Sequence, residues 1–155
     1  MNGSRLTLLA ALVANGLGWV LPVVYDDRGW RAFRAALSPL WPYAGFRIEP
    51  GLLLVLSVAS ALTNLLFIVL AIVLVVREGR ARTVLWAAAG ATLLNLHWPI
   101  SMGDERRLLE AGYFVWVCSF VLLALAAFLT LRTSRREVKS VRRWDGCGGR
   151  GHSLD

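Results

Sequence analysis

The sequence predicts an all-α integral membrane protein, an antiparallel bundle of four transmembrane helices with a short interfacial amphipathic helix in its first outer loop. Of its 155 residues, 57% are hydrophobic and 17% are charged, whereas about a quarter of the residues in a soluble domain carry charge. The charged residues cluster between four apolar runs, at residues 6–24, 52–76, 83–100 and 111–131. Apolar runs of this length have few uses outside a lipid bilayer.

Each apolar run is predicted to be a helix. At 1.5 Å per residue the four runs extend roughly 27 to 38 Å, against a hydrocarbon core of about 30 Å. Backbone groups inside lipid must satisfy their own hydrogen bonds, which a helix does within one segment. The first run resembles a signal peptide at Arg5 and Ala14–Gly16. It stays apolar through Val24, however, and is too long for a usual signal, so we expect a retained anchor.

The first outer loop, residues 25–50, is predicted to contain the interfacial helix. Its apolar residues recur at helical spacing: Trp30, Phe33, Leu37 and Leu40. Arginines form a separate stripe: Arg28, Arg31 and Arg34. Such a helix lies in the plane of the membrane surface. In the second outer loop, Ser101 to Asp104 resembles a capping box, which predicts that the fourth helix begins near Met102.

Arginine and lysine set the predicted topology. Placing both termini inside puts eleven of these residues on the inner side, namely Arg5, three at residues 77–82 and seven in the tail, against six in the outer loops. The positive-inside rule therefore predicts cytoplasmic N- and C-termini. Lysine occurs once among the 17 basic residues. This bias suggests a GC-rich bacterial genome and hence the bacterial cytoplasmic membrane.

Residues 1–131 are predicted to form the transmembrane domain and residues 132–155 a basic, partly disordered cytoplasmic tail. The basic residues next to the membrane are Arg132, Arg135, Arg136, Lys139, Arg142 and Arg143. They are expected to contact anionic lipid headgroups at the cytoplasmic face. A nucleic-acid partner is not expected, because nothing beyond charge favours one.

Amides and hydroxyls within the apolar runs are predicted to form a polar intramembrane seam. Its members are Asn15, Ser57, Ser60, Asn64, Asn95 and Ser119, which lie on stripes of small residues. Small residues let helices approach, and a polar side chain in lipid usually faces another helix. A solute path lined by the same groups is the alternative. We favour packing, because no ionisable residue joins the set near mid-membrane.

His97 is the one ionisable group within an apolar run and is a possible pH-sensitive residue. It lies two positions from Asn95, which on a helix puts the two on nearly opposite faces, so we favour an interfacial histidine. The outer-loop carboxylates lie at helix starts, where capping explains them. No metal site and no cofactor is predicted, and no catalytic motif is present.

Together these features favour a non-enzymatic polytopic membrane protein, an accessory or assembly subunit that acts by helix packing. The expected partners, besides the bilayer itself, are a second copy of the chain or another membrane protein. A small transporter or channel subunit that uses the polar seam is the first alternative. A membrane enzyme acting on lipid through the outer-loop carboxylates is the second.

Overall fold

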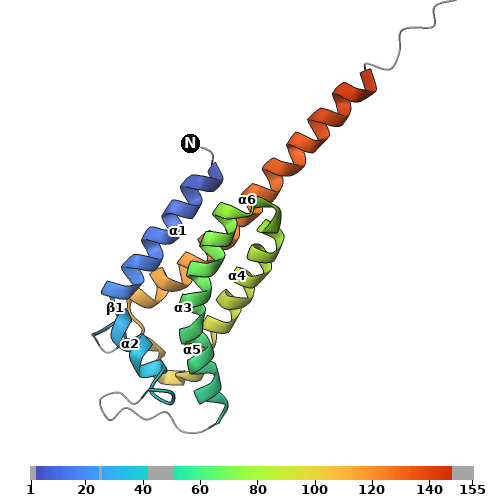
Figure 1. Cartoon of the computed structure of the whole chain (residues 1–155). Helices are drawn as coiled ribbons and strands as arrows, with labels where there is room; N and C mark the ends of the chain where they lie inside the picture. The colour runs from blue at the N-terminus through green and yellow to red at the C-terminus, as the bar shows by residue number, and fades with distance from the viewer. Residues whose placement is uncertain (1–2, 25, 42–50, 148–155) are drawn as a thin grey trace, which may run out of the picture.

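The computed structural model describes residues 3–24, 26–41 and 51–147, and this part of the chain is mostly helical (Figure 1). In order, the elements are α1 (Gly3–Val20), β1 (Pro22–Val24), β2 (Asp27–Arg28), α2 (Gly29–Ala36), α3 (Leu52–Val76), η1 (Glu78–Arg80), α4 (Ala81–Asn95), α5 (His97–Ser101), η2 (Gly103–Leu108) and α6 (Ala111–Cys147). The two short strands pair antiparallel.

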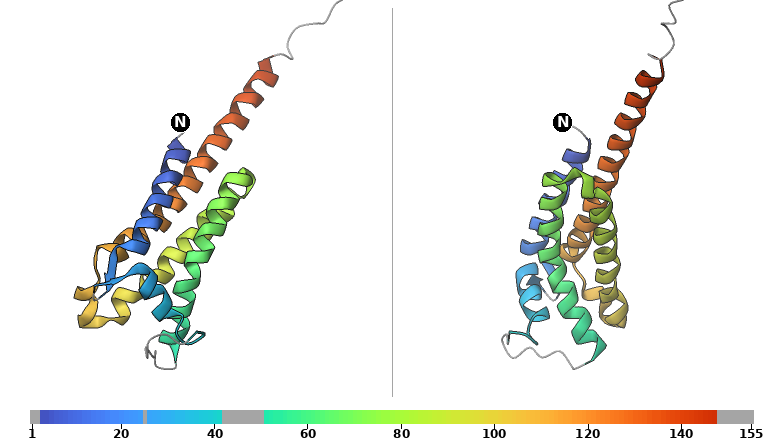
Figure 2. Two further views of the ribbon diagram at one scale, coloured as in Figure 1. Left: turned by 60° about the vertical axis from the view of Figure 1, so that its left-hand side comes forward. Right: turned by 45° about the vertical axis from the view of Figure 1, so that its right-hand side comes forward.

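The long helices pack as a chain of neighbours. α1 lies along α6, α6 along α4, and α4 along α3, while α2 crosses between α1 and α3 and contacts both (Figures 1 and 2). Phe67 of α3 meets Phe120 of α6 edge to face, with ring centroids 5.3 Å apart. Both rings are buried with Val84 of α4 and Leu123 of α6. α1 and α3 do not pack along each other, so the bundle is open on that side.

The ends of the bundle differ. The start of α1, η1 and the C-terminal half of α6 lie toward one end, whereas α2, α5 and η2 lie at the other, here named the loop end (Figures 1 and 2). The helices therefore alternate in direction, as the sequence predicts.

Two helices within the described residues are long and apolar enough to cross a membrane, α3 and the Ala111–Ser134 part of α6. Their 25 and 24 residues correspond to about 38 and 36 Å. The other two helices of the bundle are shorter, α1 with 18 residues and α4 with 15. The predicted run at residues 6–24 stops being helical at Val20, because Pro22 lacks an N–H and disfavours a helical Leu21. The run at residues 83–100 divides at Leu96 into α4 and α5.

The last helix differs from the expectation at both ends. It does not begin near Met102: Gly103 has a φ of +53°, which favours glycine, and η2 follows before α6 begins at Ala111. At the other end α6 continues past Leu131 to Cys147, so the first part of the predicted tail is helical. Residues 148–155, with most of the glycine-rich end that was expected to be disordered, lie outside the described residues.

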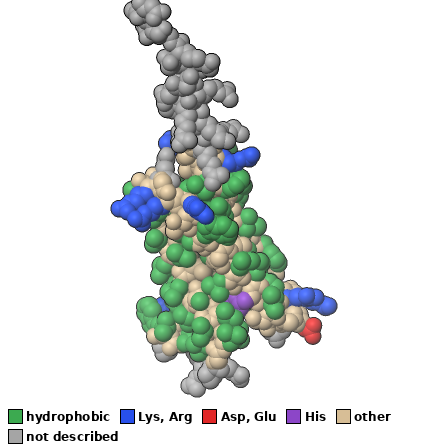
Figure 3. Space-filling view, turned by 90° about the vertical axis from the view of Figure 1, so that its right-hand side faces the viewer, with side chains coloured by type: hydrophobic (Ala, Val, Ile, Leu, Met, Phe, Trp, Pro, Cys, Tyr) green, Lys and Arg blue, Asp and Glu red, His purple; other side chains and the backbone are tan. Residues whose placement is uncertain are grey.

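Large apolar side chains cover the outside of the bundle. On the face in Figure 3, hydrophobic residues occupy the middle and Lys and Arg side chains lie nearer its two ends. Six large apolar residues of α1 are between 45% and 58% exposed: Leu6, Leu9, Leu12, Val13, Leu17 and Val20. An apolar surface of this extent marks contact with lipid or with another protein.

Candidate functional site

The first part of the polar seam joins α3 to α4. The Ser60 hydroxyl donates to Asn95 Oδ1 at 2.7 Å, and Asn95 Nδ2 donates to Thr63 Oγ1 at 3.1 Å. The Tyr113 hydroxyl of α6 donates to the Asn95 backbone oxygen at 2.9 Å. All four residues are buried. The Asn95 side chain is thus satisfied through both its oxygen and its nitrogen, as burial of an amide requires.

The second part of the seam lies between α1 and α6. Asn15 Nδ2 donates to Ser119 Oγ at 3.2 Å, and Ser119 donates to its own helix at Trp116 O. Asn64 connects α3 to α6 instead, because its Oδ1 accepts from Trp116 Nε1 at 2.8 Å. Ser57 is buried, and among the described residues its hydroxyl bonds only to Leu53 O of its own helix. The six predicted residues therefore form separate contacts rather than one continuous polar path.

Sequence reasoning missed the aromatic members of this network. Trp98, Tyr113 and Trp116 were not among the predicted seam residues, yet each donates a hydrogen bond to the seam. A signal was present: Tyr113, Trp116 and Ser119 recur every three residues, which places them on one side of the helix. Thr63, between Ser60 and Asn64, was also missed.

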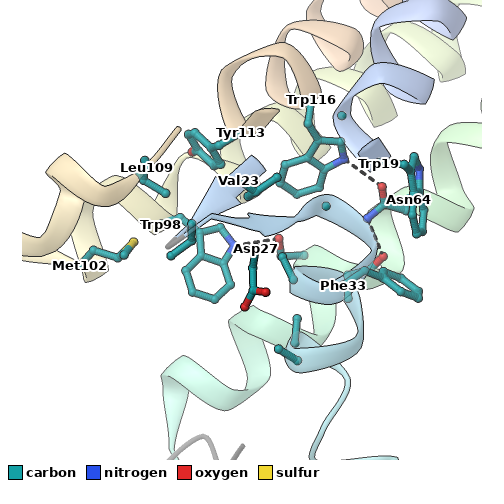
Figure 4. Close-up of a pocket in the computed structure, with 18 of the residues that line it drawn as sticks. Trp19, Val23, Asp27, Phe33, Asn64, Trp98, Met102, Leu109, Tyr113 and Trp116 are labelled. Atoms are coloured by element: carbon teal, nitrogen blue, oxygen red, sulfur yellow. Dashed lines mark hydrogen bonds between the residues drawn. The ribbon is translucent and has the colours of Figure 1, made fainter. Parts of the chain in front are cut away.

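A cavity of about 640 Å³ lies at the loop end, between α1, α2, α3, α5 and α6 (Figure 4). Typical ligand pockets occupy about 300–1,000 Å³. Small and aliphatic residues make up most of its lining, together with five aromatic side chains: Trp19, Phe33, Trp98, Tyr113 and Trp116. Polar groups at the wall include Ser60, Asn64 and Asp27. Part of the predicted seam thus borders an open space.

Glycines bring α2 close to the end of α1. A Cβ atom at Gly29, the first residue of α2, would collide with the backbone oxygen of Gly18. A Cβ at Gly18 would come within 2.9 Å of Trp116 Cβ. Only the missing side chains let α1, α2 and α6 approach this closely, so these two glycines shape the wall of the cavity.

The predicted interfacial stripe is present as helix α2 and the turn after it, but its residues face different surroundings. Phe33 packs on Trp19 at 5.1 Å between ring centroids and lines the cavity. Leu37 is half-buried, whereas Trp30 and Leu40 are 42% and 70% exposed. That Trp30 and Leu40 contact lipid stays a prediction. Arg31 bonds Asp27 at 3.5 Å across the protein surface.

A second, wholly apolar depression of about 260 Å³ lies between α1 and α3. Leu8 and Leu12 line it from α1; the α3 side consists of Ile68, Ala71, Ile72, Val75 and Val76. Ile68 follows Asn64, a cavity residue, by one helical turn, about 6 Å. The cavity and the depression therefore lie along the same open side of the bundle. We call this side the α1/α3 gap.

His97 is half-buried and packs on the ring of Trp98. Its Nδ1 lies 2.7 Å from Leu94 O, and since a carbonyl only accepts, Nδ1 carries the proton. Nε2 is buried without a hydrogen-bond partner among the described residues. Asn95 is fully buried in the seam, so His97 does not share its environment.

Among the predicted lipid-binding basic residues, the structure describes the side chain of Arg132, which is exposed and lies over the Phe128 ring at 5.6 Å. The side chains of Arg135, Arg136, Lys139, Arg142 and Arg143 lie outside the described residues.

No protein-family model, no curated protein and no solved structure matches this chain.

Proposed function

We propose that this protein is a non-enzymatic membrane protein that crosses the bilayer four times. In the α1/α3 gap it holds a lipid-like amphiphile that has one long alkyl chain. The observation that carries the proposal is the largely apolar cavity of about 640 Å³, continued by an apolar depression on the same side. A long apolar chain fits the depression and a polar end fits the cavity.

The packing of the helices supports four crossings. α1 lies along α6, and α4 lies between α6 and α3. A bilayer that surrounds the two long helices therefore also surrounds the two shorter ones. The exposed leucines and valines of α1 then face lipid instead of water, which removes the cost of leaving them hydrated.

The combined length of the cavity and the depression matches the thickness of one bilayer leaflet. From Asn64 at the cavity to Val75 in the depression, α3 advances eleven residues, which is about 17 Å and close to half of a hydrocarbon core of about 30 Å. A guest with its polar end at the loop end and its chain along α3 would lie parallel to the neighbouring lipids. It could also exchange with them sideways, because α1 and α3 do not close the gap.

The proposed orientation places both termini in the cytoplasm, in accordance with the arginine and lysine distribution. A reporter that fluoresces only in the cytoplasm, fused after Asp155, is expected to be bright, because eleven basic residues lie on that side. Fusion of the same reporter within residues 42–50 should be dark. A dark C-terminal fusion together with a bright loop fusion would reverse the topology.

The proposal predicts that larger side chains in the α1/α3 gap prevent the amphiphile from binding. The purified full chain is irradiated with a long-chain alcohol that carries a photoreactive group, and labelled peptides are identified by mass spectrometry. Label is expected on α1 and α3, and Ala61→Phe and Ala71→Phe should reduce it severalfold. Both alanines are buried and line the gap. Ala10→Phe is the matched control, because Ala10 is exposed on α1.

Equal labelling of the wild type and both gap-filling variants would contradict the proposal. Elution of the wild type as a dimer, with the two variants monomeric, would show that a helix of a second copy fills the gap. That result would favour the packing function that the sequence suggests.

A further inference from the structure

We infer that the cavity at the loop end selects amphiphiles whose polar end is a bulky organic cation, such as a quaternary ammonium group. This inference rests on the proposed function and specifies which polar end the cavity accepts. The described residues at its wall combine aromatic side chains, one carboxylate and several hydrogen-bond donors that are already engaged (Figure 4).

The aromatic side chains come from four helices that converge on the cavity. Trp19 belongs to α1, Phe33 to α2 and Trp98 to α5, while α6 contributes Tyr113 and Trp116. The face of an aromatic ring carries negative potential, and several such faces around one space attract quaternary ammonium groups. Because these faces are also apolar, they accept the alkyl surface of such a cation.

Among the described residues, the charge at the cavity wall is negative. Asp27 lines the cavity, and no arginine or lysine does so among the described residues. Arg31 bonds the Asp27 carboxylate at a long 3.5 Å, with both side chains about half exposed. Such an ion pair is weak and can exchange for another cation. The cavity therefore offers a carboxylate to a positive ligand.

Several of the donors that an anionic polar end would need are already engaged. The indole N–H groups of Trp98 and Trp116 already donate to Ser60 and to Asn64 Oδ1. Asn64 Nδ2 donates to Ala61 O, and the Tyr113 hydroxyl donates to Asn95 O. Binding a phosphate or carboxylate through these groups would break internal hydrogen bonds, whereas a quaternary cation needs no donor at all.

The test uses two probes of nearly the same shape and opposite charge, tetraphenylphosphonium and tetraphenylborate. Binding to the purified full chain is measured by equilibrium dialysis, with protein-free micelles subtracted. The wild type is expected to prefer the phosphonium. Asp27→Asn should weaken phosphonium binding about fivefold, the size of a partly exposed charge interaction, and should not weaken borate binding.

Two further variants separate this charge effect from a change in structure. Asp26→Asn makes the same charge change at an exposed neighbour that is not part of the cavity wall, and should leave binding unchanged. Arg31→Gln removes the cation that competes for Asp27 and should strengthen phosphonium binding. A loss of fold in Asp27→Asn therefore leaves the inference testable through Arg31→Gln.

Equal affinity of the wild type for both probes, or equal phosphonium binding by the Asp27 and Asp26 variants, would overturn the cation selectivity. If photolabelling of the α1/α3 gap by the neutral alcohol persisted, the proposed function would stand without it. Loss of phosphonium and borate binding in the single variant Ala61→Phe would confirm that these probes occupy the cavity.

Discussion

Gly112→Ala is expected to destabilise the protein by about 2–3 kcal/mol, the upper part of the range for overpacking a tight site. Gly112 is buried in the first turn of α6, and a Cβ atom there would collide with the backbone oxygen of Pro22 and lie 2.9 Å from that of Leu21. Both oxygens belong to backbone, which cannot rotate away as a side chain can. The contact fixes the end of α1 against the start of α6, next to the cavity.

Gly90→Ala is the matched control, and its effect on stability should have the opposite sign. Gly90 is exposed in the interior of α4, and a Cβ there meets nothing within 4 Å. In a helix interior, alanine is more favourable than glycine by about 1 kcal/mol. This variant should therefore be as stable as the wild type or more stable. Thermal unfolding in detergent, followed by tryptophan fluorescence, gives both values. Equal shifts in melting temperature for the two variants would show that the contact at Gly112 contributes nothing.

Much of the helical architecture follows from the sequence, because it depends on long runs whose length and hydrophobicity are decisive. Residues 52–76 are the clearest case, and α3 has these bounds. Helix ends were less predictable where a local backbone feature intervened. Pro22 ended α1 early, while the division at Leu96 and the positive φ of Gly103 depend on how the loop end packs.

The seam residues were recognisable from the sequence because an amide in an apolar run needs a partner. Their pairing was not recognisable, since Asn15 and Ser119 are 104 residues apart and only the packing of α1 on α6 brings them together. The cavity had no sequence signal of its own. It arises where α2 crosses between α1 and α3, and that crossing depends on close contact at Gly18 and Gly29.

Asn95→Leu is expected to cost about 2–3 kcal/mol, toward the upper end for leaving buried polar groups unpaired. Asn95 is fully buried, and its removal takes the acceptor from Ser60 and the donor from Thr63 at once. Asn15→Leu is the comparison. It breaks one longer bond, to Ser119, and should cost about 0.6 kcal/mol, the average for a hydrogen bond between membrane helices.

A double-mutant cycle separates the Asn95 network from simple changes in side-chain volume. Ser60→Ala and Asn95→Leu are made singly and together, and unfolding free energies are measured in the same detergent. Because Ser60 donates to Asn95 and accepts from Trp98, the double variant should cost less than the sum of the single ones by more than about 0.5 kcal/mol. Additive costs, with Asn95→Leu no worse than Asn15→Leu, would mean that the amide stabilises the bundle no more than an ordinary interhelical contact. The coupled result would instead show that the Asn95 side chain holds α4 against α3 through its hydrogen bonds with Ser60 and Thr63.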